Sequence, residues 1–322
     1  MMESLKKLSL VIYVVTIALG LPFNIFALYV FYKRSRVRMT PNLIYMINLC
    51  SSDLVFILFL PIKIIETSTN QWTLPAILCP IYNFFHFSTI YASACFLTAV
   101  SIGRYLGAAF PITYQMYKKP RYSFFICLAL WALVIFHVAL VFFIEIGLNA
   151  NANFFLSTTV NGTECYDNFS EEQLKVVVPV RLELSIVLFF LPLAITTFCY
   201  AHCLRILMRS QMHASKKKRA IRVAITTMAL FIVCFAPYNI SHVIGFAIQD
   251  NVWWRREALL PSTCNAFLDP LIFYSLSSAA DKGFLHFCKS LQKKYGPMQQ
   301  NLSAAWVKAE EKKKPLTIST IV

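Results

Sequence analysis

Residues 79–105 read CPIYNFFHFSTIYASACFLTAVSIGRY, and no residue between Cys79 and Arg104 carries a fixed charge. A helix of this length rises roughly 36 Å at about 1.5 Å per residue, which is enough to cross a hydrocarbon core of about 30 Å. Hydroxyl, imidazole and thiol groups recur along the stretch, so such a helix cannot face lipid on every side. We therefore expect it to be the central helix of a membrane bundle, with Cys79 at its outer end and Arg104 at its inner end.

The composition of the whole chain is that of a membrane protein, with 322 residues of which 58% are hydrophobic and 14% are charged. A net charge of +15 would suggest nucleic acid as partner for a soluble protein. Here the cations lie mainly in short loops and in the tail, which favours anionic membrane lipid instead. The chain has ten cysteines but no CxxC spacing, and HExxH and GxSxG are absent. We therefore expect neither a cofactor, a bound sodium ion aside, nor enzymatic activity.

Seven apolar segments predict seven membrane-spanning helices, at about 8–32, 41–65, 77–105, 122–145, 177–206, 220–247 and 256–276. The first is too long for a signal peptide and has no cleavage pattern, so we expect it to remain as a span. Clusters of Lys and Arg follow the first, third, fifth and seventh segments. By the positive-inside rule, this multi-pass protein should have an extracellular N-terminus and a cytoplasmic C-terminus.

The loop at 146–176 should then lie outside, and it carries two glycosylation sequons, at Asn161 and Asn168. Cys165 lies in the same loop, and Cys79 begins the third span on the same side. Since these two cysteines are the ones expected in oxidising surroundings, we predict a disulfide between them. The alternative is that both thiols stay free.

Beyond the seventh span, residues 281–295 read DKGFLHFCKSLQKKY, which predicts a short amphipathic eighth helix on the inner leaflet. Cys288 in this stretch is a candidate for palmitoylation, and an unmodified thiol is the alternative. We expect one seven-helix membrane domain over 1–290, including the amphipathic helix. The tail at 291–322 is highly charged and is expected to be disordered.

The chain resembles the rhodopsin-like (class A) G-protein-coupled receptors over residues 8–290. Each span carries its own motif, and the motifs occur in order: GLPFN with Asn24, NLCSSDL with Asp53, Cys79 and GRY at 103–105, Trp131, FFLPLAITTFCY with Pro192 and Tyr200, CFAPYN with Pro237, and DPLIFY with Asp269 and Pro270. The resemblance implies an all-α membrane protein, a seven-helix bundle in the plasma membrane. It also implies a heterotrimeric G protein and arrestin as partners, with Arg104, Tyr200 and Arg222 near the G-protein groove.

Two positions depart from the family pattern. Gly103 stands where an acid usually precedes the arginine, so the latch between that acid and Arg104 is missing. Phe273 stands at a usual tyrosine position, with Tyr274 beside it. We expect weaker restraint of the resting state as a result.

A narrower resemblance points to the free fatty acid receptors. CYDNFSEEQLKVVVPVRLELSIVLFFLPLAITTFCY, CFAPYNISHVIGF and WWRREALLPSTCNAFLDPLIFY are similar to the short-chain branch. SIGRYLGAAFP and the pair His86 and Tyr91 are similar to the medium- and long-chain member. The resemblance implies a receptor for short-chain carboxylates such as acetate, propionate and butyrate, with a medium- or long-chain ligand as the alternative.

Arg181 is the most informative single residue, because it lies inside an apolar run near the outer end of the fifth span. A membrane arginine is a functional candidate by default, although one that snorkels to the interface is the plainer alternative. Arg255 precedes the seventh span on the same side. Two guanidiniums at one mouth suit a carboxylate, and the family resemblance assigns both as carboxylate anchors.

Four further side chains are candidate ligand contacts: Tyr91, His137, Tyr238 and His242. Tyr238 and His242 are four residues apart and should share one helix face. A lone histidine in an apolar helix is more often structural, which is the alternative for His86 and His137. From the resemblance, Glu145 and Asp167 should pair with Arg181 and Arg255. Glu183 is a weaker candidate for Arg181, since a residue two positions along a helix points elsewhere.

Deeper in the bundle, the resemblance implies a sodium site formed by Asp53, Ser93, Asn265 and Asp269. Oxygen ligands suit a hard cation, and protonated acids bonded to water are the alternative. A carboxylate transporter is the rival function. Against it, the sequence has no evident internal repeat, and its arginines cluster at one mouth rather than near mid-membrane.

Overall fold

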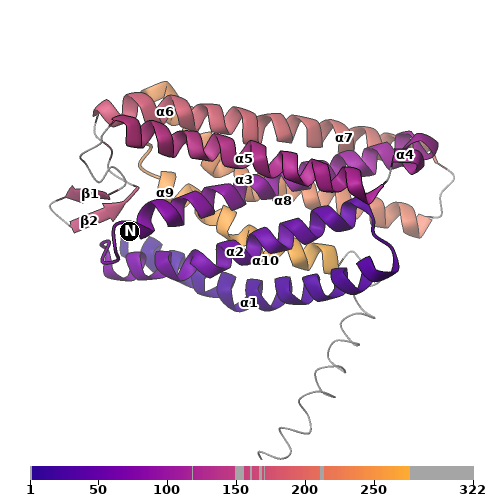
Figure 1. Cartoon of the computed structure of the whole chain (residues 1–322), viewed down its shortest axis with the longest axis horizontal. Helices are drawn as coiled ribbons and strands as arrows, with labels where there is room; N and C mark the ends of the chain where they lie inside the picture. The colour runs from indigo at the N-terminus through magenta and orange to yellow at the C-terminus, as the bar shows by residue number, and fades with distance from the viewer. Residues whose placement is uncertain are drawn as a thin grey trace, which may run out of the picture. The chain divides into compact units, whose positions relative to one another are not determined.

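The structure is a computed structural model, and it describes residues 2–117, 119–148, 156–159, 162–166, 169, 171–210 and 214–275. Helices account for nearly all of them (Figure 1). In chain order the elements are α1 Met2–Val37, α2 Pro41–Thr69, α3 Leu78–Ala109, α4 Pro111–Tyr117, α5 Pro120–Leu148, β1 Leu156–Thr159, β2 Gly162–Cys165, α6 Glu171–Ser185, the π-helix η1 Ile186–Phe190, α7 Leu191–Arg209, α8 Ala214–Ile248, α9 Arg255–Ala258 and α10 Leu260–Ser275.

The helices agree with the predicted membrane spans. Within the described residues, six helical segments are long and apolar enough to cross a membrane: α1, α2, α3, α5, the continuous α6–η1–α7 and α8. The seventh predicted span, 256–276, falls on α9 and α10. The predicted eighth helix, the lipidation of Cys288, the domain boundary at 290 and the tail all lie outside the described residues and stay predictions.

α3 is the central helix, as its polar stripe predicted. In its most apolar 18-residue window 89% of the residues are buried, against 22% to 50% in the other five candidate spans. α3 contacts α2, α5, α7 and α8. Its polar groups meet these neighbours: Thr98 Oγ1 lies 3.0 Å from Thr196 Oγ1 of α7. The Thr98 hydroxyl, which would be costly in lipid, is therefore satisfied inside the bundle.

The fifth span is continuous but not uniform. A π-helical segment, η1, separates α6 from α7, and Pro192 is the second residue after it. Because proline has no N–H to donate to the carbonyl four residues earlier, the α-helical ladder is interrupted here. η1 accommodates this interruption without ending the helix.

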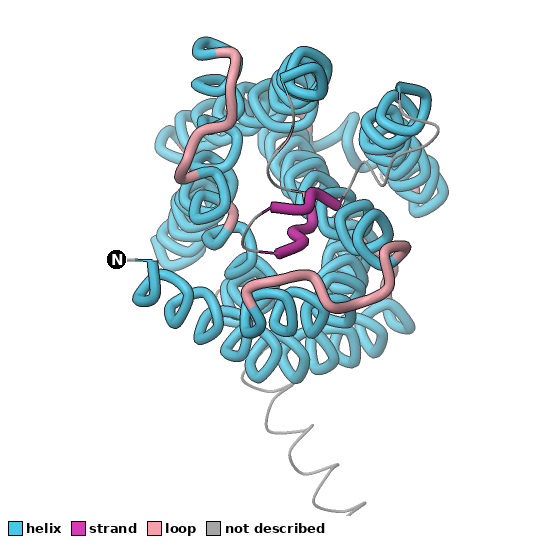
Figure 2. Tube along the Cα trace, turned by 90° about the vertical axis from the view of Figure 1, so that its left-hand side faces the viewer, coloured by secondary structure: helices cyan, strands magenta, loops and turns pink. Residues whose placement is uncertain are grey.

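A short hairpin in the predicted outer loop was not foreseen from the sequence. β1 pairs antiparallel with β2, with Leu156 opposite Cys165. Figure 2 looks along the bundle and shows the two strands lying across the helix ends. We call this end of the bundle the hairpin end and the opposite end the far end. The short helix α4, which follows α3 at the far end, was also not predicted.

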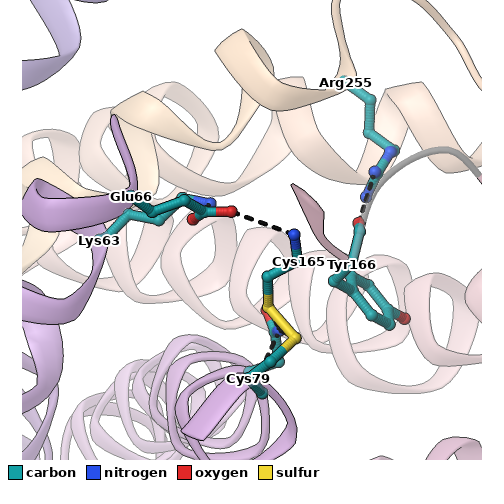
Figure 3. The surroundings of a disulfide bond; sticks show 7 residues. Lys63, Glu66, Cys79, Cys165, Tyr166 and Arg255 are labelled. Atoms are coloured by element: carbon teal, nitrogen blue, oxygen red, sulfur yellow. Dashed lines mark hydrogen bonds and ion pairs between the residues drawn. A yellow bond between two sulfur atoms is a disulfide. The ribbon is translucent and has the colours of Figure 1, made fainter. Parts of the chain in front are cut away.

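A disulfide joins Cys79 at the start of α3 to Cys165 at the end of β2, as predicted (Figure 3). Asn83, one turn along α3, donates to the Cys165 sulfur at 3.1 Å. The hairpin is thus attached to the central helix by a covalent bond and by a neighbouring side chain.

Candidate functional site

Two buried guanidiniums define a candidate site at the hairpin end. Arg181 of α6 is 4% exposed and Arg255 at the start of α9 is 8% exposed. Both line one small cavity of about 10 Å³, together with His242 and Asn251. That is close to the space one water molecule needs. The structure therefore brings the two arginines together, and Arg181 does not snorkel to the surface.

The partners of Arg181 leave part of its guanidinium unpaired. Its Nη1 donates to the side-chain oxygen of Asn251 at 2.7 Å. Its Nε and Nη2 are buried and have no hydrogen-bond partner in the part of the chain that is described. These two nitrogens form one edge of the guanidinium, and such an edge can donate to both oxygens of a carboxylate. A buried donor without a partner is costly, so this edge is ready for an anionic acceptor.

Aromatic rings surround the two cations. The Arg181 guanidinium carbon lies 5.2 Å from the Tyr166 ring centroid and 4.8 Å from that of Phe169. Arg255 lies 5.9 Å from the Tyr166 ring and donates from Nη2 to the Tyr166 carbonyl at 3.1 Å (Figure 3). Cation–π contacts of this kind compensate part of the desolvation of a buried guanidinium.

The predicted polar residues of the sixth and third spans lie close by. Tyr238 and His242 are buried on α8, with ring centroids 4.3 Å apart. Tyr238 also stacks on Phe87 of α3 at 5.9 Å. Tyr91 is buried in the same core cluster as Tyr166 and Tyr238. His86 is buried among Phe56, Tyr82 and Phe87 on the side of α3 that faces α2.

His137 is engaged elsewhere. Its Nδ1 donates to the Leu133 carbonyl at 2.8 Å, and its Nε2 lies 3.2 Å from the Glu183 carboxylate. Glu183 therefore faces α5, which agrees with the expectation that it points away from Arg181. The side chain of Glu145 and the whole of Asp167 lie outside the described residues, as do the sequons at Asn161 and Asn168. Their predicted roles remain predictions.

Sequence reasoning missed several residues at this end of the bundle. Lys63 and Glu66 of α2 form a partly buried ion pair, 2.6 Å from Nζ to Oε2. Opposite charges three residues apart at the end of an apolar segment were a detectable signal for it. Asn251, Tyr166 and Phe169 lie in loops, and nothing in their spacing relates them to the arginines.

The buried polar groups of the predicted sodium site are incompletely paired. Asp53, Ser93, Asn265 and Asp269 are all buried. Four of their oxygens have no hydrogen-bond partner among the described residues: Asp53 Oδ2, Asn265 Oδ1 and both carboxylate oxygens of Asp269. Within the same residues, no three His, Cys, Asp or Glu side chains lie close enough together to hold a metal ion. The oxygen set fits a hard cation by its chemistry.

The three residues expected near a G-protein groove lie towards the far end, on α3, α7 and α8. Arg104 is partly exposed and Arg222 is exposed. Tyr200 is buried, and its hydroxyl has no hydrogen-bond partner within the described ranges.

Comparison with known proteins agrees with this architecture. The family described as "7 transmembrane receptor (rhodopsin family)" matches residues 6–273. Free fatty acid receptor 3 of Mus musculus is 38% identical over 293 residues, which are 91% of this chain and 90% of that protein. Free fatty acid receptor 2 of Mus musculus is 40% identical over 287 residues, which are 87% of this chain and 84% of that protein. Free fatty acid receptor 1 of Macaca fascicularis is 40% identical over 282 residues, which are 84% of this chain and 92% of that protein.

The family is one of multi-pass plasma-membrane receptors and not of enzymes, which confirms both expectations from the sequence. The identities to the three receptors differ too little to choose one of them. The chain therefore belongs to the rhodopsin family of seven-transmembrane receptors and, within it, to the free fatty acid receptors.

Proposed function

We propose that this protein is a G-protein-coupled receptor for short-chain fatty acids such as acetate, propionate and butyrate. Arg181 and Arg255 bind the ligand carboxylate at the hairpin end, which faces the cell exterior. The observation that carries the proposal is the buried and unpaired Nε–Nη2 edge of Arg181. A carboxylate presents two oxygens at the spacing this edge requires.

Both arginines bind neutral oxygens in the absence of ligand. Arg181 donates to the Asn251 amide oxygen and Arg255 to the Tyr166 carbonyl. A carboxylate is a stronger acceptor than either, because bonds between ionised partners are roughly twice as strong as neutral ones. The ligand can therefore use the free edge of Arg181, with Arg255 lining the same cavity.

The small size of the cavity favours short acids. The space beside the arginines is about 10 Å³, and the buried side chains of Tyr238 and His242 lie near it. A tail of one to three carbons beyond the carboxylate, as in acetate, propionate and butyrate, requires modest rearrangement, whereas a long chain requires the aromatic core around Tyr91 to open. A medium- or long-chain ligand is the second candidate, and similarity to free fatty acid receptor 1 supports it.

Signalling then requires that the ligand bind one conformation more tightly than another. α8 carries Tyr238 and His242 near the site and Arg222 towards the far end. It is the element we expect to move, so that a heterotrimeric G protein binds between Arg104, Tyr200 and Arg222. Arrestin would bind the same end. Asp53, Ser93, Asn265 and Asp269 would hold a sodium ion between the two ends.

The test is a propionate dose–response with G-protein readout for Arg181→Ala and Arg255→Ala at matched surface expression. Loss of a hydrogen bond to a charged group removes about 1.5–3 kcal/mol, so each variant should lose roughly 10- to 150-fold in potency. Arg181→Lys should rescue poorly, because an ammonium lacks the planar edge. Lys175→Ala removes an exposed cation from the same helix and should behave as wild type.

The methyl ester of propionate should be inactive on the wild type. If both alanine variants reach the surface and respond to propionate like wild type, the carboxylate-anchor proposal is wrong. Accumulation of labelled acetate in proteoliposomes would instead favour the transporter.

A further inference from the structure

The hairpin end of α2 carries a partly buried ion pair that the proposed ligand contacts do not use. The Lys63 ammonium lies 2.6 Å from Glu66 Oε2, and the two side chains are only 15% and 8% exposed. Burying a charged pair carries a desolvation cost that the mutual attraction often fails to offset. If the pair served only to pack the end of α2 against its neighbours, apolar side chains would do so at lower cost. We therefore look for another role.

The second carboxylate oxygen of Glu66 contacts the hairpin. Glu66 Oε1 accepts a hydrogen bond from the backbone N–H of Cys165 at 3.2 Å (Figure 3). Cys165 is also bound covalently to Cys79 of α3. The end of β2 is therefore held from α2 by the carboxylate and from α3 by the disulfide.

The residue after Cys165 has an unusual backbone conformation. Tyr166 has φ of 57°, in the left-handed region that bulky residues rarely adopt. Such a conformation persists only where the surroundings hold it, and it is common at ligand sites. The two attachments of Cys165 supply that restraint immediately before Tyr166.

Tyr166 in turn contacts both arginines of the proposed site. Its carbonyl accepts from Arg255 Nη2 at 3.1 Å, and its ring lies 5.2 Å from the Arg181 guanidinium. A change of φ at Tyr166 would move both the carbonyl and the ring. The geometry around the two guanidiniums thus depends on how the chain is held at Cys165.

We propose that Glu66 is a positioning residue for the carboxylate site. Its hydrogen bond to the Cys165 N–H fixes the backbone of Tyr166, and Tyr166 orients Arg255 and packs against Arg181. The inference rests on the proposed function of the two arginines. The position of the Glu66 oxygen that accepts from the Cys165 N–H sets the geometry of the site, whereas the charge of the ion pair does not.

Two variants separate the acceptor from the charge. Glu66→Asp keeps the negative charge near Lys63, but its side chain is one methylene shorter and cannot reach the Cys165 N–H. The double variant Lys63→Met with Glu66→Gln removes both charges, but keeps an oxygen at the original length. Both changes conserve volume well enough for the receptor to reach the cell surface. Glu3→Gln is the control, because Glu3 forms an exposed ion pair with Lys7.

The readout is propionate potency at matched surface expression, measured beside Arg255→Ala. Glu66→Asp should lose about 2- to 12-fold in potency with the maximal response retained, less than the loss of a direct ligand contact, because Glu66 acts on the ligand only through Tyr166. The neutral double variant and Glu3→Gln should stay near wild type. If the double variant loses potency and Glu66→Asp does not, the charge acts and the inference is overturned.

The two proposals fail in different ways. Wild-type potency in Glu66→Asp beside a loss in Arg255→Ala overturns the positioning role alone. Wild-type potency in Arg255→Ala and Arg181→Ala overturns the proposed function itself, whatever the Glu66 variants do.

Discussion

Gly103 gives a direct test of whether the missing acid before Arg104 raises basal signalling. Gly103 lies on α3 where a Cβ would come 2.8 Å from Asn42 Oδ1 and 3.4 Å from the Tyr114 hydroxyl. The nearer atom is the end of a side chain, and it has no hydrogen-bond partner among the described residues. The side chain of Gly103→Asp can therefore be accommodated if the Asn42 side chain moves aside. Its carboxylate would then lie beside Arg104.

The magnitude follows from the exposure of Arg104, which is partly exposed. Ion pairs at such positions are worth about 0.2–1 kcal/mol. At 1.4 kcal/mol per tenfold change, the active fraction without ligand should fall about 1.4- to 5-fold. Crowding of Asn42 is a separate effect of the same substitution, and Gly103→Ala introduces it without the charge.

The assay is ligand-independent G-protein activation in membranes with matched receptor levels. Gly103→Asp should signal less than Gly103→Ala, and the difference between the two variants measures the charge alone. Tyr114→Phe in the Gly103→Asp background removes the other nearby donor and should leave most of the difference if Arg104 is the partner. A basal level in Gly103→Asp equal to or above that of Gly103→Ala would refute the reasoning.

Two further outcomes are expected. Cys165→Ser removes a disulfide between residues 86 positions apart, which contributes about 4 to 5 kcal/mol to stability in the chain-entropy model. Surface expression and propionate response should fall together, because Tyr166 directly follows Cys165. Full expression with wild-type potency would contradict this role. Glu183→Gln should change propionate potency by less than about fivefold, because its carboxylate faces His137 and such pairs are worth at most about 1 kcal/mol. A loss as large as that of Arg181→Ala would mean that Glu183 acts on the arginine after all.

The membrane spans and the central position of α3 were predictable, because both depend on properties local to each segment. Hydrophobicity over 20 residues identifies a span, and the hydroxyls along 79–105 indicate that the helix is surrounded by protein. The disulfide followed from the side of the membrane on which Cys79 and Cys165 were expected. The position of Arg181 inside an apolar run indicated that its side chain could be buried.

The immediate partners of the arginines were not predictable. Asn251 and Tyr166 reach Arg181 from loops whose path depends on contacts distant in sequence, and no periodicity encodes such a path. The left-handed φ of Tyr166 is equally invisible, since tyrosine does not favour it. The acids that the resemblance implies as partners, Glu145 and Asp167, lie outside the described side chains, so their pairing with the arginines stays a prediction.

The π-helical segment Ile186–Phe190 makes the direction of Arg181 a matter of residue count. Arg181 precedes this segment and Tyr200 follows it, so the two ends of the span are related by the number of residues between them. Each residue of an α-helix turns the chain by about 100° and advances it about 1.5 Å. Because a π-helix uses about one more residue per turn than an α-helix, converting 186–190 to α-helix without deleting a residue would swing Arg181 about a quarter-turn away from Arg255 relative to α7. Deleting one residue there would nearly preserve the direction of Arg181. Chimaeras joined within this span would lose carboxylate binding where the joined sequence forms an uninterrupted α-helix of the same residue count, because Arg181 would then face away from Arg255.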